Sequence, residues 1–317
     1  MLRRLIFSFM ISRLVNFTLI SFFLAFSYAN SSTLAQEIAD PEFKAIIAHP
    51  AYSKSGPRVL FDEGHNNSHT THGRYKPFAD LITEDGYYIV TSRKTFTKES
   101  LATFKIVIVV NALGAEDVDD EGAANSAFTD SECEAVREWV KSGGALLLVA
   151  GPAPFGKSAE SLAKQFGVEI VSNESKGSPA QDGEGPGTIV YSRESGFVVD
   201  HPITQGRNEG EKVSRVVAVP GQALKTAEAG GVFLRPGEPA AEKATAPGKD
   251  ATTAAQAKGI AVKSGKGRVV VLGEPEMISA QLAGREKSPI GMNYPGVDNR
   301  QLALNIMHWL SGLLRER

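Results

Sequence analysis

Polar side chains suited to ligand or metal binding gather between residues 59 and 85. The segment carries three of the six histidines, two carboxylates, two amides and one arginine, namely His65, His69, His72, Asp62, Glu63, Asn66, Asn67 and Arg74. Imidazole, carboxylate and amide groups hydrogen-bond hydroxyls and carboxylates, and imidazoles also coordinate metal ions. We therefore expect the functional site in this segment.

A strand must precede this polar segment and a helix must follow it. Residues 59–61 are a short apolar run between Pro57 and Gly64, which is typical of a strand, and the later apolar residues recur at helical spacing: Tyr75, Phe78, Ala79 and Ile82. Ligands of open α/β sheets bind in the crevice outside the carboxyl ends of the strands. We expect the loop at residues 63–74 to lie there.

Two kinds of site fit these residues. The first is a binding site for a small polar ligand, without a cofactor and without catalysis, formed by Glu63, His65, Asn67, His69 and Arg74. The alternative is a zinc site of a metal-dependent hydrolase, with His65, His69 and His72 as ligands and Glu63 as general base. The same groups also have the chemistry to hydrogen-bond one another and hold a long loop in place.

Arg74 has two interpretations of its own. It opens the predicted helix, where backbone donors and the helix dipole favour an anion. Its guanidinium also has the chemistry to pair with Asp62 or Glu63 instead.

Strands and helical segments alternate four times up to residue 171. After the first pair, apolar or β-forming runs occupy residues 87–91, 106–110, 145–150 and 168–171. Helices are predicted around residues 158–166 and after Thr129, whose Thr-Asp-Ser-Glu sequence is a capping box. This alternation predicts an α/β fold with a doubly wound, mainly parallel sheet and helices on both faces.

The rest of the chain adds strands and a final helix. Short apolar runs at residues 216–219, 231–234, 260–263 and 268–272 predict strands, and the last two flank a hairpin turn. A short helix is expected at residues 41–47, and a final helix begins near Asp298, a natural N-cap. Residues 172–187 and 237–258 are polar and rich in Gly, Pro or Ala, and we expect them to be flexible insertions.

The amino terminus has the layout of a secretory signal peptide. Residues 1–29 carry three arginines and no acidic residue, and they contain an apolar run from Leu14 to Phe26. Cleavage is expected after Ala29 or Ala35, which gives a periplasmic or secreted protein. The alternative is an uncleaved segment that anchors the protein to the membrane. A lead-in at residues 30–56 then precedes a domain at residues 57–315.

The composition argues against a nucleic-acid-binding protein. The formal net charge is −2 and no basic patch or Cys/His finger spacing occurs, so nucleic acid is not an expected partner. The expected partner is a small polar ligand or a protein of the cell envelope.

The single cysteine, Cys133, falls on the apolar face of its predicted helix and forms no intramolecular disulfide.

Motifs along the chain resemble a bacterial domain family of unknown function within the class I glutamine amidotransferase-like superfamily. The resemblance covers most of residues 57–315 and rests on residues 61–67, 73–81, 138–144, 200–203, 267–274 and 299–310. Related domains occur in gliding-motility-type transporter accessory proteins and in intraflagellar-transport proteins, as binding modules. The resemblance implies a flavodoxin-like fold.

The resemblance does not imply glutaminase activity. Amidotransferases of this superfamily place a cysteine on a sharp turn after a central strand and a His-x-Glu pair downstream. The corresponding turn here is Gly151-Pro152-Ala153-Pro154, and no His-x-Glu sequence occurs. Proline and alanine cannot supply a thiolate, so we expect no glutaminase activity.

Overall fold

The computed structural model describes residues 37–53, 56–171, 188–228, 231–235 and 255–314. All of them belong to one compact unit, Glu37–Arg317. The expected signal peptide and the expected insertion at residues 172–187 lie outside the described residues, as do residues 237–254 of the second insertion.

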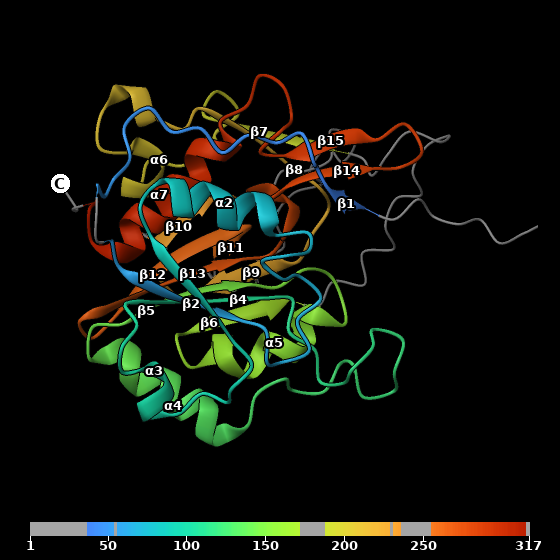
Figure 1. The fold of residues 1–317 in the computed structure, drawn as a ribbon, viewed down its shortest axis with the longest axis vertical. Helices are drawn as coiled ribbons and strands as arrows, with labels where there is room; N and C mark the ends of the chain where they lie inside the picture. Colours follow the sequence, from blue (N-terminus) through green and yellow to red (C-terminus); the bar gives the residue numbers. More distant parts are fainter. Residues whose placement is uncertain (1–36, 54–55, 172–187, 229–230, 236–254, 315–317) are drawn as a thin grey trace, which may run out of the picture. The chain divides into compact units, whose positions relative to one another are not determined.

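The central sheet has seven strands: β2 Arg58–Asp62, β3 Tyr88–Ser92, β4 Ile106–Val110, β5 Ala145–Val149, β10 Val232–Leu234, β12 Gly259–Ser264 and β13 Gly267–Leu272. Their order is β10-β12-β13-β5-β4-β2-β3 (Figure 1). The five strands from β13 to β3 are parallel. β12 and β10 continue the sheet antiparallel, with β12 joined to β13 by the predicted hairpin turn.

Side chains of the sheet alternate between two hydrophobic cores, one on each face. In β4, Ile106, Ile108 and Val110 belong to one core, and Val107 and Val109 belong to the other. A strand that is covered on both faces must be apolar at every position. This is why the central strands read as unbroken apolar runs in the sequence.

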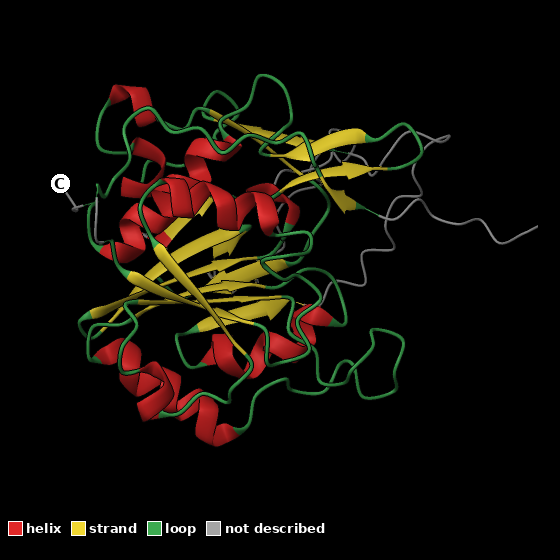
Figure 2. Ribbon diagram, viewed as in Figure 1, coloured by secondary structure: helices red, strands yellow, loops and turns green. Residues whose placement is uncertain are grey.

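Helices cover both faces of the sheet (Figures 1 and 2). The long helices α2 Lys76–Glu84 and α7 Asn299–Ser311 pack on the first core, and α3 Lys98–Leu101, α4 Asp130–Lys141 and α5 Phe155–Lys164 pack on the second. The predicted α/β fold, a flavodoxin-like and mainly parallel sheet between two layers of helices, is confirmed.

The ends of two helices test the predicted caps. The Thr129 hydroxyl accepts a hydrogen bond from the Glu132 backbone, and the Glu132 side chain accepts one from the Thr129 backbone, so the capping box of α4 is confirmed. Asp298 precedes α7 as predicted but does not cap it. Its Oδ2 instead accepts from the backbone N–H groups of Ser214 and Arg215, at 2.7 and 3.0 Å.

The strand predicted at residues 168–171 forms, but outside the central sheet. This strand, β6 Val168–Val171, pairs antiparallel with β9 Ala223–Thr226 in a separate sheet with β11 Ala255–Ala257. The position beside β5 is taken by β13, which arrives about 100 residues later in the chain. Alternation of strands and helices alone therefore assigns the fifth parallel strand to β6, whereas β13 occupies that place.

The remaining elements of the described residues form two small sheets and three short helices. They are the pair β7 Ile189–Ser192 and β8 Arg215–Ala218, the sheet of β1 Ile38–Ala39, β14 Ala280–Ala283 and β15 Ser288–Gly291, and the short helices α6 Pro202–Gln205, η2 Glu209–Glu211 and η4 Glu276–Ile278.

Two predictions made from the sequence are wrong: a helix, and the end of the second insertion. The helix expected at residues 41–47 does not form; Pro41 lies in a turn. Residues 255–258, assigned to the second insertion, instead form β11 and a bend before β12, where the Lys258 ammonium donates to the Gln222 carbonyl at 3.1 Å. Among the helices of the described residues, none has the length and hydropathy needed to cross a bilayer.

Candidate functional site

Loops that follow β2, β3 and β4 surround a hollow at the carboxyl edge of the sheet. We call it the carboxyl-edge hollow; its volume is about 540 Å³, and it is lined by Glu63, Gly64, Asn66, Asn67, Ser68, Thr70, Arg93, Leu113, Glu116, Asp117 and Val118. This is the position that the fold favours for a ligand. Of the five predicted binding residues, Glu63 and Asn67 line it, whereas His65, His69 and Arg74 do not.

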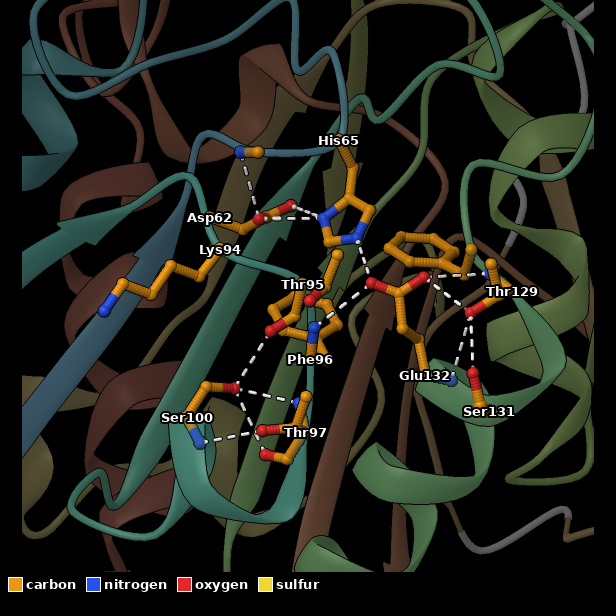
Figure 3. A network of polar contacts seen from close by, with 12 residues as sticks. Asp62, His65, Lys94, Thr95, Phe96, Thr97, Ser100, Thr129, Ser131 and Glu132 are labelled. Carbon is orange, nitrogen blue, oxygen red and sulfur yellow. Dashed lines mark hydrogen bonds and ion pairs between the residues drawn. The ribbon is translucent and has the colours of Figure 1, made fainter.

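His65 does not line the hollow and is held by two carboxylates (Figure 3). Its Nδ1 is 2.9 Å from both carboxylate oxygens of Asp62, and its Nε2 is 3.0 Å from Oε1 of Glu132. The rings of Phe96 and Phe128 flank the imidazole, with centroids at 4.6 and 4.7 Å. We call Asp62, His65 and Glu132 the histidine clamp.

The electrostatics of the clamp favour a charged imidazole. Burial lowers the pKa of His65, but the hydrogen bonds and charges of Asp62 and then Glu132 outweigh it and raise that pKa above 6.5. Burial also raises the pKa of Glu132, and the hydrogen bonds from His65, Thr129 and Phe96 outweigh it and lower that pKa to about 2. With both ring nitrogens engaged and 7% of the residue exposed, His65 positions other groups and has no atom left for a ligand.

Asn67 and Glu63 differ in what they offer to the hollow. The Asn67 amide donates to Asp62 Oδ2 at 3.0 Å and to the Val110 carbonyl, while its oxygen accepts from the His65 backbone. Its polar atoms are therefore used within the protein. Glu63 Oε1 accepts from the backbone and the hydroxyl of Thr71, at 3.0 and 2.9 Å, and Oε2 makes no hydrogen bond to the described residues. Glu63 thus holds one oxygen ready for a ligand.

His69 is buried beneath the same loop. Its Nδ1 lies 2.8 Å from the Ser68 hydroxyl and 3.3 Å from Nδ2 of Asn111, a residue with a left-handed φ of 46°. Burial, and then the charge of Arg74, lower the pKa of His69 to about 3. Because both neighbours are able to donate to Nδ1, the proton of this neutral ring lies on Nε2, which finds no partner among the described residues.

The three histidines of the zinc alternative lie in different surroundings. His65 belongs to the clamp, His69 contacts Asn111, and the exposed His72 has its Nδ1 3.1 Å from the Thr71 hydroxyl. Within the described ranges, no three His, Cys, Asp or Glu side chains are grouped so as to hold a metal ion.

Arg74 faces neither of its two expected partners. Its Nη1 lies 3.6 Å from Oε2 of Glu37, ahead of β1, and its carbonyl accepts from the Ser279 hydroxyl at 2.6 Å. Burial, and then the charge of Glu276, raise the pKa of Glu37 to about 7, although Arg74 opposes this shift. Arg74 thus belongs to a contact between the amino-terminal strand and the domain.

Several residues that line the hollow were missed in the sequence. They follow the strands next to β2: Arg93 comes directly after β3, and Glu116 and Asp117 come shortly after β4. The signal was present, because carboxyl ends of parallel strands meet at one edge and polar residues just past them share a crevice. Applying this rule to all three strands would have identified these residues.

The turn after β5 carries no nucleophile. The Gly151 backbone N–H donates to the Asn111 side-chain oxygen at 2.8 Å, and a side chain at this position would meet Pro275 and Asn111 at 3.2 to 3.4 Å. The cysteine of the chain, Cys133, is buried in α4 on the opposite face of the sheet from α2. Glutaminase chemistry has no attacking group at this turn.

Comparison with known proteins shows similarity at the level of the fold. No protein-family model and no curated protein sequence matches the chain. The solved mmIFT52 N-terminal domain is similar in structure, with a TM-score of 0.55, 17% identity, and coverage of 80% of this chain and 97% of that chain.

Two further solved structures are less similar. A GMP synthase subunit from Thermoplasma acidophilum has a TM-score of 0.40 and 12% identity, and covers 81% of this chain and 96% of that chain. A ThuA-like protein from Bacteroides uniformis has a TM-score of 0.38 and 13% identity, and the match covers 84% of this chain and 93% of that chain. At such identities the likeness to the mmIFT52 N-terminal domain shows the fold alone.

Proposed function

We propose that this chain is a non-catalytic binding domain that takes a small polar ligand, a sugar or a cell-wall fragment, in the carboxyl-edge hollow. The observation that carries the proposal is the set of free polar groups around a space of about 540 Å³. Glu63 Oε2 and the Arg93 guanidinium make no hydrogen bond to the described residues, and Glu116 is exposed beside them. Convergent polar groups on a preformed hollow are the usual features of a small-molecule site.

The charge of these groups narrows the ligand class. Three carboxylates, Glu63, Glu116 and Asp117, face one guanidinium, Arg93. Carboxylates accept hydrogen bonds from hydroxyl and amide donors, and a guanidinium donates to carbonyl oxygens. A ligand rich in hydroxyl and amide groups satisfies both, which is the chemistry of an amino-sugar fragment.

The nearest arrangement to a catalytic pair is Ser68 with His69. The Ser68 hydroxyl donates to His69 Nδ1 at 2.8 Å, as in a nucleophile and its base. However, a base with a pKa of about 3 gains almost no proton at neutral pH, and no carboxylate orients the opposite ring nitrogen. This arrangement supports a structural contact, and therefore binding without turnover.

The proposed place of the chain is among the non-glutaminase members of the amidotransferase-like superfamily. The support is the fold together with a turn after β5 that lacks a nucleophile. We also propose that the protein works outside the cytoplasm, in the periplasm or after secretion, because of the apolar, Arg-flanked sequence of residues 1–29. Mass spectrometry of the protein from the envelope fraction tests this: a chain that begins at Asn30 or Gln36 supports export, and an intact Met1 in the cytoplasm contradicts it.

Calorimetric titration with muramyl dipeptide, a soluble cell-wall fragment, tests the binding proposal. The expected result is saturable binding to wild type that Arg93→Ala weakens about tenfold, which corresponds to a lost charged hydrogen bond. Lys94→Ala is the matched control, because Lys94 is the exposed next residue and does not line the hollow, and it should bind as wild type does. Absence of binding to wild type, or equal weakening by both variants, contradicts the proposal.

A further inference from the structure

A second hollow lies beside α7, away from the carboxyl-edge hollow. Its volume is about 640 Å³, and its walls are α7, the segment at residues 46–50 and the turn at residues 207–211. We call it the α7 hollow. Asp85, which follows α2 and precedes β3, lines it, so it opens near the amino ends of the parallel strands. None of its residues lines the carboxyl-edge hollow.

A buried histidine pair lines this hollow. His308 Nε2 lies 2.7 Å from Asp85 Oδ2, and the two side chains are each 1% exposed. Asp85 Oδ1 also accepts from the Ala51 backbone at 2.7 Å. With the Asp85 carboxylate as acceptor, Nε2 carries the ring proton. Nδ1 of His308 then has no hydrogen-bond partner among the described residues, and an unpartnered buried nitrogen is costly.

Two arginines, Arg207 and Arg300, line the hollow, and only one of them is paired with a carboxylate. Arg207 is paired with Glu211, with Nη2 2.5 Å from Oε1. Arg300 donates only to backbone carbonyls, those of Lys44 and Ile46, and lies over the Phe43 ring with its carbon 4.6 Å from the centroid. In the described part of the chain, Arg300 has no carboxylate partner, so its charge is uncompensated.

Apolar side chains complete the lining. Leu304 lies on α7 between Arg300 and His308, one helical turn from each, and Ile47 and Pro50 lie on the facing segment. Ile46, at the same wall, is 72% exposed, which is unusual for a large hydrophobic side chain. The Arg300 end of the hollow therefore has donors for an anion, and the wall between Arg300 and His308 has apolar surface.

We propose that the α7 hollow binds a small organic anion, one carboxylate joined to a short apolar body. The carboxylate contacts the Arg300 guanidinium, and the apolar body lies along Leu304 and Ile47 towards His308.

Titration of uniformly ¹⁵N-labelled protein with hexanoate tests this site. The expected result is a saturable shift of the backbone amide resonances of residues 46–50 and of α7 from Arg300 to Leu304, with little response to hexanamide, which lacks the charge. Acetate, which lacks the apolar body, should bind more weakly. No shift with hexanoate, or an equal response to hexanamide, overturns the proposal.

Variants separate a specific contact from general attraction. Arg300→Gln should weaken hexanoate binding about tenfold or more, as expected for the loss of a charged hydrogen bond. Lys44→Gln is the matched control, because it removes one positive charge from an exposed neighbour that does not line the hollow. Arg300→Lys keeps the charge and should recover part of the affinity. Equal weakening by Lys44→Gln and Arg300→Gln contradicts a specific site.

The α7 hollow and the carboxyl-edge hollow should bind their ligands independently. Muramyl dipeptide should leave the amide resonances of α7 unchanged, and hexanoate should leave binding of muramyl dipeptide unchanged. If Arg300→Gln shifts the melting temperature, its amide resonances outside α7 and residues 43–50 report whether the fold is intact. An intact fold with undiminished hexanoate binding counts against the proposal.

Discussion

Nε2 of His65 lies 3.0 Å from Oε1 of Glu132, a residue 67 positions further along the chain. The same Glu132 oxygen accepts from the Phe96 backbone at 3.1 Å, and the other accepts from Thr129. One imidazole thus joins the end of β2 to the first turn of α4 and to the loop after β3. Two of these elements lead into the loops of the carboxyl-edge hollow, so the clamp fixes the walls of the proposed site.

Removing the imidazole should destabilise the protein strongly. His65→Gln leaves Asp62 and Glu132 as buried carboxylates without their cationic partner, which costs about 3–5 kcal/mol of unfolding free energy. Urea unfolding measures this loss. His72→Gln, at an exposed histidine of the same loop, is the control and should stay within about 0.5 kcal/mol of wild type. A similar small change at both positions would refute a structural role for the clamp.

The contribution of the clamp should depend on pH in two directions. The pKa of His65 is raised above 6.5 on folding, so its contribution is complete below pH 6.5 and is lost as the pH rises through the folded pKa. The pKa of Glu132 falls from 4.5 to about 2, so its contribution is complete above pH 4.5 and is lost as the pH falls towards 2.

The stability lost in His65→Gln should therefore be largest between about pH 4.5 and 6.5. Urea unfolding of wild type and variant across the pH range measures this difference. A difference that stays constant from acid to alkaline pH would show that the ring acts by packing alone, between Phe96 and Phe128.

Glu37→Gln should stabilise the protein at alkaline pH. The pKa of Glu37 is raised from 4.5 to about 7, so wild type loses stability as the pH rises from 4.5 through 7, where the unfolded chain is ionised first. Glutamine carries no such penalty. Thermal unfolding at pH 5 and pH 8 should show the gain only at pH 8, and Glu42→Gln, an exposed neighbour, should show none. A gain that is equal at both pH values is the contradicting outcome.

Ser68 should not react as an activated nucleophile. His69, its hydrogen-bond acceptor, has a pKa of about 3 and is a weak base at neutral pH. Incubation with a fluorophosphonate followed by mass spectrometry of the Ser68 peptide should find no adduct above the level of the His69→Ala variant. Rapid labelling of Ser68 that depends on His69 would contradict the non-catalytic assignment.

Local pattern predicted the elements of the fold, because each depends on neighbours in the sequence. The apolar run at β4 and the Thr129 capping box are complete within a few residues. Either β6 or β13 could pair with β5 in the central sheet, and β13 does so. The periodicity of apolar residues predicts that both segments are strands but not which of them pairs with β5. The edge that holds the hollow followed from topology alone.

The roles of single side chains were harder to predict. His65, His69 and Arg74 have the right chemistry for a site, yet each is used within the protein. Glu132 is the partner of His65, and Glu37 is the partner of Arg74. Both glutamates are distant from the loop in the sequence, and no local pattern links them to it. Only groups without such partners, such as Arg93 and Glu63 Oε2, remain for a ligand, and a local sequence pattern cannot show which groups these are.

Chemical-shift mapping of the ¹⁵N-labelled protein with muramyl dipeptide shows whether the carboxyl-edge hollow binds a ligand. Saturable shifts are expected for backbone amides at residues 63–70, at Arg93 and at residues 113–118, which are the loops around this hollow. Resonances of α7 should stay in place. A spectrum without shifts, or shifts confined to residues outside these loops, would contradict the assignment of the carboxyl-edge hollow as the binding site.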